Sequence, residues 1–336
     1  MTTLVTGAAG FIGYHVARSL LARGERVVGI DNLNDYYDPH LKQDRIGELH
    51  KLNAGDFIFH KVDFADDGAL ERTLGPLEFD RIVHLGAQAG VRYSLENPRA
   101  YLTANVMGHL NLLELARARG SSHFVYASSS SVYGGNTSLP FRVEDRVDHP
   151  VSLYAATKRA DELMSETYAH LFHIPMTGLR FFTVYGPWGR PDMAMWIFTR
   201  KILAGEPIEV FNHGNMRRDF TYIDDIVSGV LACLDNPPAD DGKKKAGGSR
   251  AAHRLYNIGN NRAEDLMRMI AIIEEACGRK AHIEMGPMQP GDVAETFADI
   301  SAIRQDLGFR PITSLDQGVP RFVQWYREYV TGGRSA

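Results

Sequence analysis

Tyr154 and Lys158 are the two residues whose types and spacing point most directly to chemistry. They are four positions apart, so they share one face if the segment is helical. A phenol, with a reference pKa near ~10, is a weak base at neutral pH, but an ammonium group held close favours its ionised form. The pair therefore predicts a tyrosine that removes a proton from a substrate hydroxyl. Such a pair also arises by chance, so its neighbours decide the interpretation.

Serines occupy positions 128–131, where an apolar segment at 123–128 ends. A hydroxyl at the tip of a buried strand can hydrogen-bond the same substrate oxygen that the tyrosine deprotonates. The alternative is a flexible turn, which explains less well why the serines end an apolar strand.

A glycine-rich turn near the start of the chain predicts a dinucleotide site. Gly7, Gly10 and Gly13 follow a short apolar segment and precede an amphipathic run at 16–23. Glycines let the backbone approach a pyrophosphate, and a helix N-terminus supplies free N–H groups to hold it. Asp31 ends the next strand-like segment, at about the ~20-residue interval where a carboxylate holds a ribose hydroxyl. With no arginine beside it, Asp31 favours NAD over NADP; an ordinary turn aspartate is the alternative.

Strand-like and helical segments alternate through the first half of the chain. Further strands are expected at 57–63, 81–85, 123–128 and 176–181, and helices at 110–119 and 156–171. This alternation predicts an α/β fold with a Rossmann-type, doubly wound parallel sheet. Ligands bind such sheets at the carboxyl ends of the strands. The residues expected to converge there are Gly7, Asp31, Asp63, Gly86 and Ser128.

Beyond about residue 180 the alternation fades, which predicts a second, smaller lobe. We expect an NAD-binding Rossmann domain over 1–178 and a smaller α/β C-terminal substrate lobe over 179–330, with an approximate boundary that the chain may cross again. The polar, glycine-rich stretch at 238–252 is expected to be a mobile surface loop. Its three lysines, 243–245, are expected to form a solvated tip.

Composition excludes several classes of protein. The 336 residues are 44% hydrophobic and 23% charged, with a net charge of −4, so there is ample material for a core and no basic block for nucleic acid. Cys233 and Cys277 lack metal-type spacing, which argues against zinc or disulfides and favours a reducing cytoplasm. The first strand starts at the third or fourth residue, leaving no room for a cleaved signal, and no apolar run reaches ~18 residues, so no membrane span is expected.

The glycine pattern, the strand-end serines and the Tyr-x-x-x-Lys pair together resemble the extended short-chain dehydrogenase/reductase superfamily, in its nucleotide-sugar epimerase and dehydratase branch. The resemblance runs from residue 2 to about 330. Segments 31–38, 87–94 and 183–194 are similar to UDP-glucuronate 4-epimerases, NAD-dependent isomerases that interconvert UDP-glucuronic and UDP-galacturonic acids. The resemblance therefore implies C4 epimerisation through a transient 4-keto sugar, with NAD recycled.

The resemblance assigns three catalytic positions. It makes Tyr154 the base, Lys158 its partner that also holds the nicotinamide ribose, and Ser129 the catalytic serine. Ser128 and Ser130 remain alternatives to Ser129. Dehydratase relatives carry an Asp-Glu pair after that position, whereas this chain has Ser130 and Ser131, so dehydration is disfavoured.

The resemblance also implies binding residues. Arg218 is expected to contact the diphosphate, Arg190 and Asp292 the nucleotide, and Arg92 and Thr183 the sugar carboxylate, with surface salt bridges as the alternative for each arginine. The expected substrate residues are Arg92, Ser129, Ser130, Thr183, Arg190, Arg218 and Asp292. The expected cofactor residues are Gly7, Gly10, Phe11, Ile12, Gly13, Asp31, Asn32, Asp63, Leu85, Gly86, Ala87, Gln88, Asn105, Tyr154 and Lys158. Alanine is usual in relatives at Gly86, so slightly looser packing is expected there.

Rival functions share the same fold. A 4-keto uronic acid is a β-keto acid that loses carbon dioxide easily, so a UDP-glucuronate decarboxylase making UDP-xylose is the nearest rival, although the run at 87–92 favours the epimerase. An epimerase acting at C4 of a different UDP-sugar is a further alternative, and a non-catalytic NAD-sensing regulator is a distant one. No metal is expected. Relatives pair through a four-helix interface, so the resemblance implies a homodimer; the apolar stretch 110–116 fits this, although core packing explains it equally well.

Overall fold

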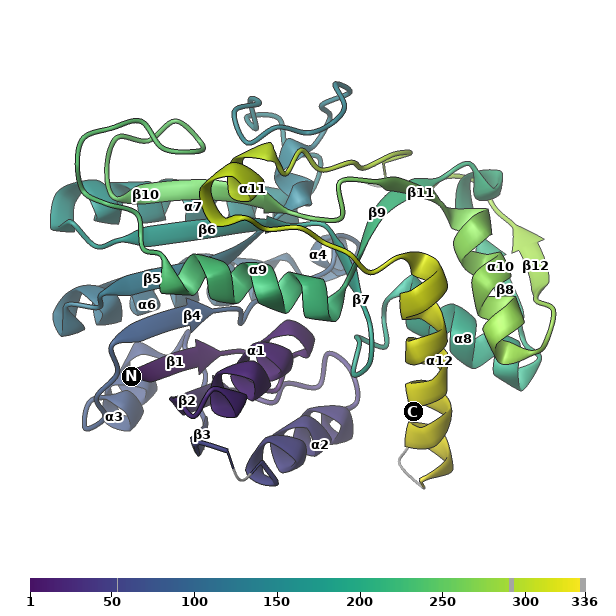
Figure 1. Ribbon diagram of the computed structural model, residues 1–336, viewed down its shortest axis with the longest axis horizontal. Coiled ribbons are helices and arrows are strands. Elements are labelled where there is room, and N and C mark those ends of the chain that lie inside the picture. Colours follow the sequence, from purple (N-terminus) through teal and green to yellow (C-terminus); the bar gives the residue numbers. More distant parts are fainter. Residues whose placement is uncertain (53, 290–292, 333–336) are drawn as a thin grey trace.

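A seven-stranded parallel sheet forms the centre of the larger lobe (Figure 1). The computed structural model describes residues 1–52, 54–289 and 293–332. The strand order is β10-β6-β5-β4-β1-β2-β3, and every pairing is parallel. The strands are β1 (Thr2–Thr6), β2 (Arg26–Asp31), β3 (Asp56–Lys61), β4 (Arg81–His84), β5 (His123–Ser129), β6 (Met176–Phe181) and β10 (His253–Ile258). The predicted α/β fold with a doubly wound parallel sheet is confirmed.

Helices cover both faces of this sheet because successive strand residues point to opposite sides. Val5 packs in one apolar cluster and Leu4 in the other, and Val125 and Phe124 divide in the same way. Both faces are therefore buried, as in other parallel sheets. One face carries α1 (Phe11–Ala22), α2 (Pro39–His50) and α9 (Ile223–Asp235); the other carries α3 (Asp67–Leu74), α6 (Gly108–Arg119) and α7 (Leu153–Phe172).

Short helical segments connect β4 to α6, and one follows β5. They are α4 (Tyr93–Glu96), α5 (Pro98–Tyr101), the π-helix η1 (Leu102–Met107) and the 3-10 helix η2 (Ser130–Tyr133). The expected helix at 110–119 lies within α6, and the one at 156–171 lies within α7.

Strand β10 is the part of the sheet that sequence patterning did not predict. It pairs with β6 after the chain has already built part of the second lobe, so the chain returns to the first lobe after residue 178. The loop before β10 contacts α7, where the Ser249 hydroxyl donates to Glu166 at 2.8 Å. Lys243 and Lys244 are exposed as expected, but Lys245 is mostly covered and bonds Asp241 at 2.7 Å. The mobility of this loop stays a prediction.

The smaller lobe is built from two small sheets and their helices, on the right of Figure 1. Its strands are β7 (Thr183–Tyr185), β9 (Arg217–Tyr222) and β11 (Ala263–Asp265) in one sheet, and β8 (Pro207–Val210) and β12 (His282–Met285) in the other. Its helical segments are α8 (Ala194–Ala204), η3 (Phe211–Gly214), α10 (Leu266–Cys277) and α12 (Leu315–Thr331). The chain also forms α11 (Ser301–Leu307), which contacts β10 of the large sheet.

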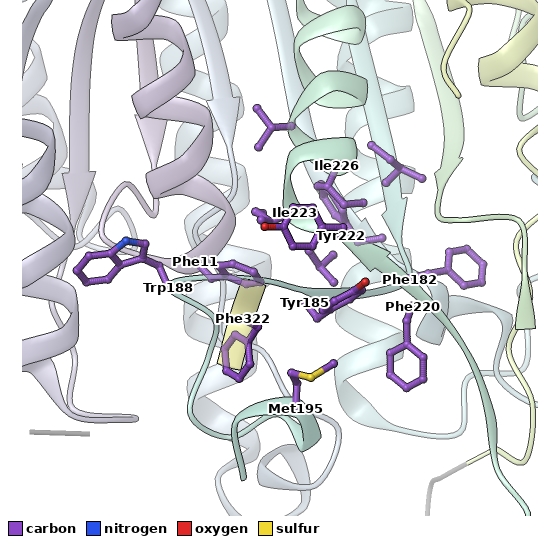
Figure 2. Packing of buried hydrophobic residues seen from close by; sticks show 14 of the residues in the cluster. Phe11, Phe182, Tyr185, Trp188, Met195, Phe220, Tyr222, Ile223, Ile226 and Phe322 are labelled. Atoms are coloured by element: carbon purple, nitrogen blue, oxygen red, sulfur yellow. The ribbon is translucent and has the colours of Figure 1, made fainter. Parts of the chain in front are cut away.

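One apolar cluster joins the two lobes. Figure 2 shows Phe11 of α1, Tyr185 of β7, Met195 of α8 and Phe322 of α12 converging, with Trp188 from the loop after β7. All five side chains are buried. Burial on this scale fixes the loop after β7 against the start of α1, where the glycine-rich turn ends.

Three further properties bear on function. Within the described ranges, no helix is long and apolar enough to cross a membrane. The same residues contain no group of three or more His, Cys, Asp or Glu placed to hold a metal ion. Cys233 and Cys277 are both free and buried.

Candidate active site

A cavity of about 930 Å³ opens at the carboxyl ends of the sheet strands and extends to the smaller lobe. The residues predicted to converge there all line it: Gly7, Asp31, Asp63, Gly86 and Ser128. The smaller lobe contributes side chains from β7, α8 and β9. The position of this site follows from the parallel topology, because only one edge of such a sheet collects these strand ends.

The glycine-rich turn forms one end of the cavity. Gly7 has a φ of +66°, in the left-handed region that favours glycine, and its carbonyl accepts from Gly10 N at 2.8 Å. A Cβ at Gly13 would lie 2.0 Å from the Gly7 carbonyl oxygen, so no side chain fits there. The turn leads into α1 without a side-chain cap, which leaves its first N–H groups for an anion such as a pyrophosphate.

Asp31 ends β2 beside this turn and is buried. Its Oδ1 accepts from Leu33 N at 2.8 Å. Burial raises the pKa of Asp31, while the Lys42 ammonium and the backbone N–H groups of Leu33 and Ala9 oppose that rise. Such a carboxylate can still accept hydrogen bonds from ribose hydroxyls.

Asn32 and Asp63 complete this side of the cavity. Asn32 Nδ2 donates to Asp63 Oδ2 at 3.0 Å, and the other Asp63 oxygen accepts from Ala65 N at 2.9 Å. The two side chains fix each other at the ends of β2 and β3.

Gly86 packs more tightly than expected. A Cβ there would lie 2.6 Å from Phe64 Cε1, so the Phe64 ring fills the space of the missing methyl group. The same ring blocks a Cβ at Gly108, at 2.4 Å. The expectation of looser packing at Gly86 is therefore wrong, because a larger neighbour takes up the volume.

Asn105 is buried behind the loop that follows β4 and does not line the cavity. Its Oδ1 accepts from Gln88 N at 2.8 Å, and its Nδ2 donates to Gln88 O at 3.1 Å and Thr157 Oγ1 at 3.0 Å. These bonds use both amide protons and one of the two acceptor positions of Oδ1. Asn105 clamps Gln88, which does line the cavity, to α7, and its own contact with a cofactor stays a prediction.

Tyr154 and Lys158 both line the cavity from the first turns of α7. Ser152 caps this helix, its Oγ accepting from Ala155 N at 3.1 Å, which fixes where the Tyr154 side chain leaves the helix. Lys158 is only 2% exposed, and its Nζ donates to the Ala127 carbonyl at 2.9 Å and to Asp161 at 3.0 Å. The predicted pair is thus brought together with the glycine-rich turn.

The serines after β5 separate into different environments. The Ser128 hydroxyl donates to Glu162 Oε1 at 2.6 Å, within a buried network that also holds Arg180. Ser129 Oγ accepts from Ser131 N at 3.2 Å and keeps its own proton for another acceptor. Because the Ser128 hydroxyl already donates to Glu162, Ser129 is favoured over Ser128 as the catalytic serine. Ser130 also lines the cavity.

Two arginines, Arg92 and Arg190, line the cavity with long side chains. The Arg92 guanidinium lies 4.8 Å from the centre of the Phe211 ring. Arg190 Nε donates to Asp192 Oδ1 at 3.0 Å, and although burial opposes it, Arg190 holds the pKa of Asp192 below its usual value. Thr183 lines the cavity at the start of β7.

Arg218 reaches the cavity from β9. Its Nη1 donates to the carbonyls of Arg217 and Ala294, each at 3.0 Å. The neighbouring Asp219 points the other way and accepts from Asn260 N and Ala298 N at 2.6 and 3.1 Å; burial raises its pKa to about 6. The expected contact Asp292 lies outside the described residues.

Two basic residues of α2 were missed from the sequence. Lys42 Nζ donates to the backbone and side-chain oxygens of Asn34 at 2.7 and 2.6 Å, and it lines the cavity. Arg45 is fully buried and donates to Ala9 O at 2.8 Å and Trp188 O at 2.7 Å, linking the glycine-rich turn to the loop after β7. The two residues are three positions apart, beside leucines that are buried, and this spacing was the only sequence signal that they lie on an inward face. The same spacing also fits a helix whose basic face is in solvent.

Comparisons with known proteins agree with this geometry. A probable UDP-glucuronate 4-epimerase of Rhizobium meliloti is 46% identical over 332 residues, covering 97% of each chain. The structure of a UDP-glucuronic acid 4-epimerase from Bacillus cereus, in complex with UDP-glucuronic acid and NAD, has a TM-score of 0.85 at 33% identity and covers 98% of this chain and 99% of its own. A UDP-glucose 4-epimerase from Thermotoga maritima, with UDP-glucose, has a TM-score of 0.86 at 28% identity and covers 98% and 100%.

Residues 3–259 match the NAD dependent epimerase/dehydratase family over three quarters of the chain. The matched region holds the glycine-rich turn, the strand-end serines and the Tyr154–Lys158 pair, all around one cavity. The chain belongs to the NAD dependent epimerase/dehydratase family.

Proposed function

We propose that the chain converts UDP-glucuronic acid to UDP-galacturonic acid by epimerisation at C4″, with NAD as a bound and recycled cofactor and a transient 4-keto sugar. The observation that carries the proposal is the convergence of Tyr154, Lys158 and Ser129 with the glycine-rich turn and three arginines around one cavity. The similarity to UDP-glucuronate 4-epimerases over nearly the whole chain supports this choice of sugar.

The residues of the larger lobe fit NAD. The Gly7–Gly13 turn and the first N–H groups of α1 would hold the pyrophosphate, Asp31 the adenine ribose, and Lys158 the nicotinamide ribose. NAD, when bound, supplies a reversible acceptor for one hydride from C4″. Asn105 supports this half indirectly, since it fixes the Gln88 backbone. We assign cofactor binding to 1–178 with β10, and sugar binding to the lobe within 179–330.

Tyr154 acts as the base in this proposal. Its phenolate takes the proton of the C4″ hydroxyl as the C4″–H bond breaks, and it returns that proton to the same oxygen after the sugar has turned its other face. Ser129 hydrogen-bonds the C4″ oxygen in both half-reactions. Lys158 favours the phenolate through its positive charge. No atom is gained or lost overall, because only the configuration at C4″ changes.

The arginines hold the rest of the substrate. Arg218 is assigned to the diphosphate, where a guanidinium pairs with two oxygens at once, and Arg190 is assigned to the nucleotide. Arg92 and Thr183 are assigned to the sugar carboxylate. The carboxylate must be held so that its C–C bond is not aligned with the C4″ carbonyl, since that alignment would release carbon dioxide.

The purified protein incubated with UDP-glucuronic acid tests the proposal. We expect UDP-galacturonic acid, formed without net NADH and without carbon dioxide. Release of carbon dioxide with UDP-xylose would replace the epimerase with a decarboxylase. Faster turnover of UDP-glucose than of UDP-glucuronic acid would change the substrate. Bound NAD with no turnover of either sugar would indicate a sensor.

We further propose a homodimer. Large apolar side chains lie exposed on η1 and α7, which contact each other: Met107 is 51% exposed and Leu163 53%. A two-fold pairing would cover these faces with four helices. Light scattering tests this, with Leu163→Glu expected to give monomers and Ile312→Glu, at an exposed site before α12, expected to leave the dimer intact.

We place the protein in the cytoplasm, in carbohydrate metabolism that supplies polysaccharide biosynthesis. The two free, buried cysteines support a reducing compartment. Fractionation of cells, followed by detection of the chain, tests the location.

A further inference from the structure

A buried carboxylate beside Lys158 has no part in the chemistry above. Asp161 is 0% exposed, one turn after Lys158 on α7, and its Oδ2 accepts from Lys158 Nζ at 3.0 Å. Its other oxygen, Oδ1, is buried with no hydrogen-bond partner among the described residues. A buried carboxylate is costly to keep, particularly one with half of its acceptor capacity unused.

The other groups around this ion pair are either matched or uncharged. Glu162, the next residue on α7, is paired with Arg180 of β6 at 2.8 Å. His84 of β4 and His109 of α6 face Lys158, and burial lowers the pKa of both well below the usual histidine value. Neither histidine therefore carries charge near neutral pH.

The same holds beside Tyr154, where burial raises the pKa of the neighbouring Tyr101 above its usual value, and on the β5 side. Burial raises the pKa of Tyr126 well above its usual value, so this phenol stays protonated next to Asp161. Burial also raises the pKa of Asp161, to about 7, against the opposing effect of Lys158. The charge that Asp161 balances is therefore that of Lys158.

We propose that Asp161 is a positioning residue that acts through Lys158. Its carboxylate fixes the ammonium group between the Ala127 carbonyl and α7, and it offsets part of the ammonium charge that Tyr154 experiences. Asp161 thereby sets the pH at which the Tyr154 base becomes ionised. This inference rests on the proposed function, because it assigns Tyr154 as the base.

The sign and size of the effect follow from simple electrostatics. Tyr154 and Asp161 are seven residues apart, or about 10 Å along a helix. One charge at that distance, at an effective dielectric constant of about 20, changes an ionisation equilibrium by about one pH unit. Removing the carboxylate leaves the full ammonium charge, which favours the phenolate at lower pH. The shift is smaller where Asp161 is itself protonated.

Asp161→Asn in the NAD-loaded enzyme is the direct test, since it removes the charge and keeps the shape. With UDP-glucuronic acid, we expect the acid limb of the kcat/KM profile to move to lower pH by up to about one unit. Glu166→Gln is the matched control: it removes a carboxylate from the same helix, where Glu166 bonds His253 at 2.7 Å, and the limb should stay in place.

A profile that does not move, or that moves to higher pH, would overturn the proposal. A lower kcat with an unmoved limb would mean that Asp161 only supports the fold. If Asp161→Asn does not fold, Asp161→Ser removes the same charge with a smaller side chain and should give the same shift.

A second measurement does not depend on turnover. The ultraviolet absorbance of phenolate, compared between Asp161→Asn and Asp161→Asn/Tyr154→Phe, isolates the titration of Tyr154 from the other tyrosines. The same comparison between the unsubstituted protein and Tyr154→Phe gives the reference midpoint, and we expect the variant midpoint to be lower. If this shift occurs in a protein that does not turn over UDP-glucuronic acid, the proposed function fails while the positioning role stands.

Discussion

The two sides of the cavity are built in different ways. The cofactor side consists of backbone and short side chains, with Gly7 and Gly13 packed so closely that no Cβ fits. The side that we assign to the sugar, here called the sugar side, consists of long side chains from separate elements, Arg92, Arg190 and Arg218, each already in contact with protein groups. An epimerase that recycles its cofactor needs the first side to be rigid, whereas its sugar must present both faces in turn. One cavity therefore combines a half built from closely packed backbone with a half built from long side chains.

Removing the Tyr154 hydroxyl should have the largest effect on turnover, since Tyr154 is assigned to both the cofactor side and the sugar side of the cavity. Tyr154→Phe is expected to lower kcat by about 10³-fold or more, because loss of a positioned base costs roughly 10²–10⁴-fold. The amount of NAD bound to the purified protein should not change. Steady-state kinetics and cofactor extraction measure the two quantities.

Tyr168→Phe is the matched control for that experiment. Tyr168 lies on the same helix, but its hydroxyl donates to Glu114 at the surface, away from the cavity. We expect near-normal turnover from this variant. Near-normal turnover from Tyr154→Phe would remove Tyr154 from the mechanism.

A methyl group at Gly13 tests the rigidity of the cofactor side. Gly13→Ala would place Cβ 2.0 Å from the Gly7 carbonyl oxygen, and because that neighbour is backbone, the turn must move. Overpacking of this kind typically costs about 1–3 kcal/mol, so we expect a lower Tm and loss of bound NAD. Calorimetry and cofactor extraction provide the measurements.

Gly47→Ala gives the comparison, because a Cβ at this helical position meets nothing within 4 Å. Replacing a helical glycine by alanine should raise stability by about 0.5–1 kcal/mol and leave NAD bound. If Gly13→Ala retained its NAD as well, the close packing of the turn would have no functional role.

Truncating Arg218 tests the sugar side. Arg218→Met should raise KM for the UDP-sugar by about 10–100-fold, because hydrogen bonds to charged groups contribute roughly 1.5–3 kcal/mol. Bound NAD should be unaffected. Arg217→Met is the control, since Arg217 does not line the cavity and pairs with Glu295 at 3.1 Å. Equal effects of the two substitutions would mean that surface charge, not a diphosphate contact, governs binding.

The contrast also explains how much could be predicted from the sequence. The cofactor side was largely predictable, because glycine spacing and strand ends impose their own local geometry: Gly7, Asp31 and Asp63 line the cavity as expected. The Tyr154–Lys158 pair was predictable for the same reason, since four residues fix one helical face. Asn105 was placed in the correct region, but the use of its amide on Gln88 depends on tertiary contacts.

Features that depend on residues far apart in the chain could not be predicted. Phe64 fills the space beside Gly86 although 22 positions separate them, and Arg45 reaches Trp188 across 143 positions. The position of strand β10 could not be predicted either, because its place at the sheet edge depends on pairing with β6 and not on its own sequence pattern. The burial of Asp161 beside Lys158 likewise depends on tertiary packing, and the sequence around it carries no sign of it.

The buried carboxyl group of Asp161 should make the free energy of unfolding depend on pH. Burial raises the pKa of Asp161 to about 7, whereas an aspartate in an unfolded chain ionises near ~3.9. Between these values the folded state holds one more proton than the unfolded state, so the free energy of unfolding should fall as pH rises from about 4 to about 7. Asp161→Asn has no such proton, so its stability relative to the unsubstituted protein should increase across that window and then level off. Denaturant titrations across that pH range measure the difference. A constant difference would mean that Lys158 stabilises the carboxylate as much as burial penalises it, and a difference that falls with pH would mean that Lys158 stabilises it more.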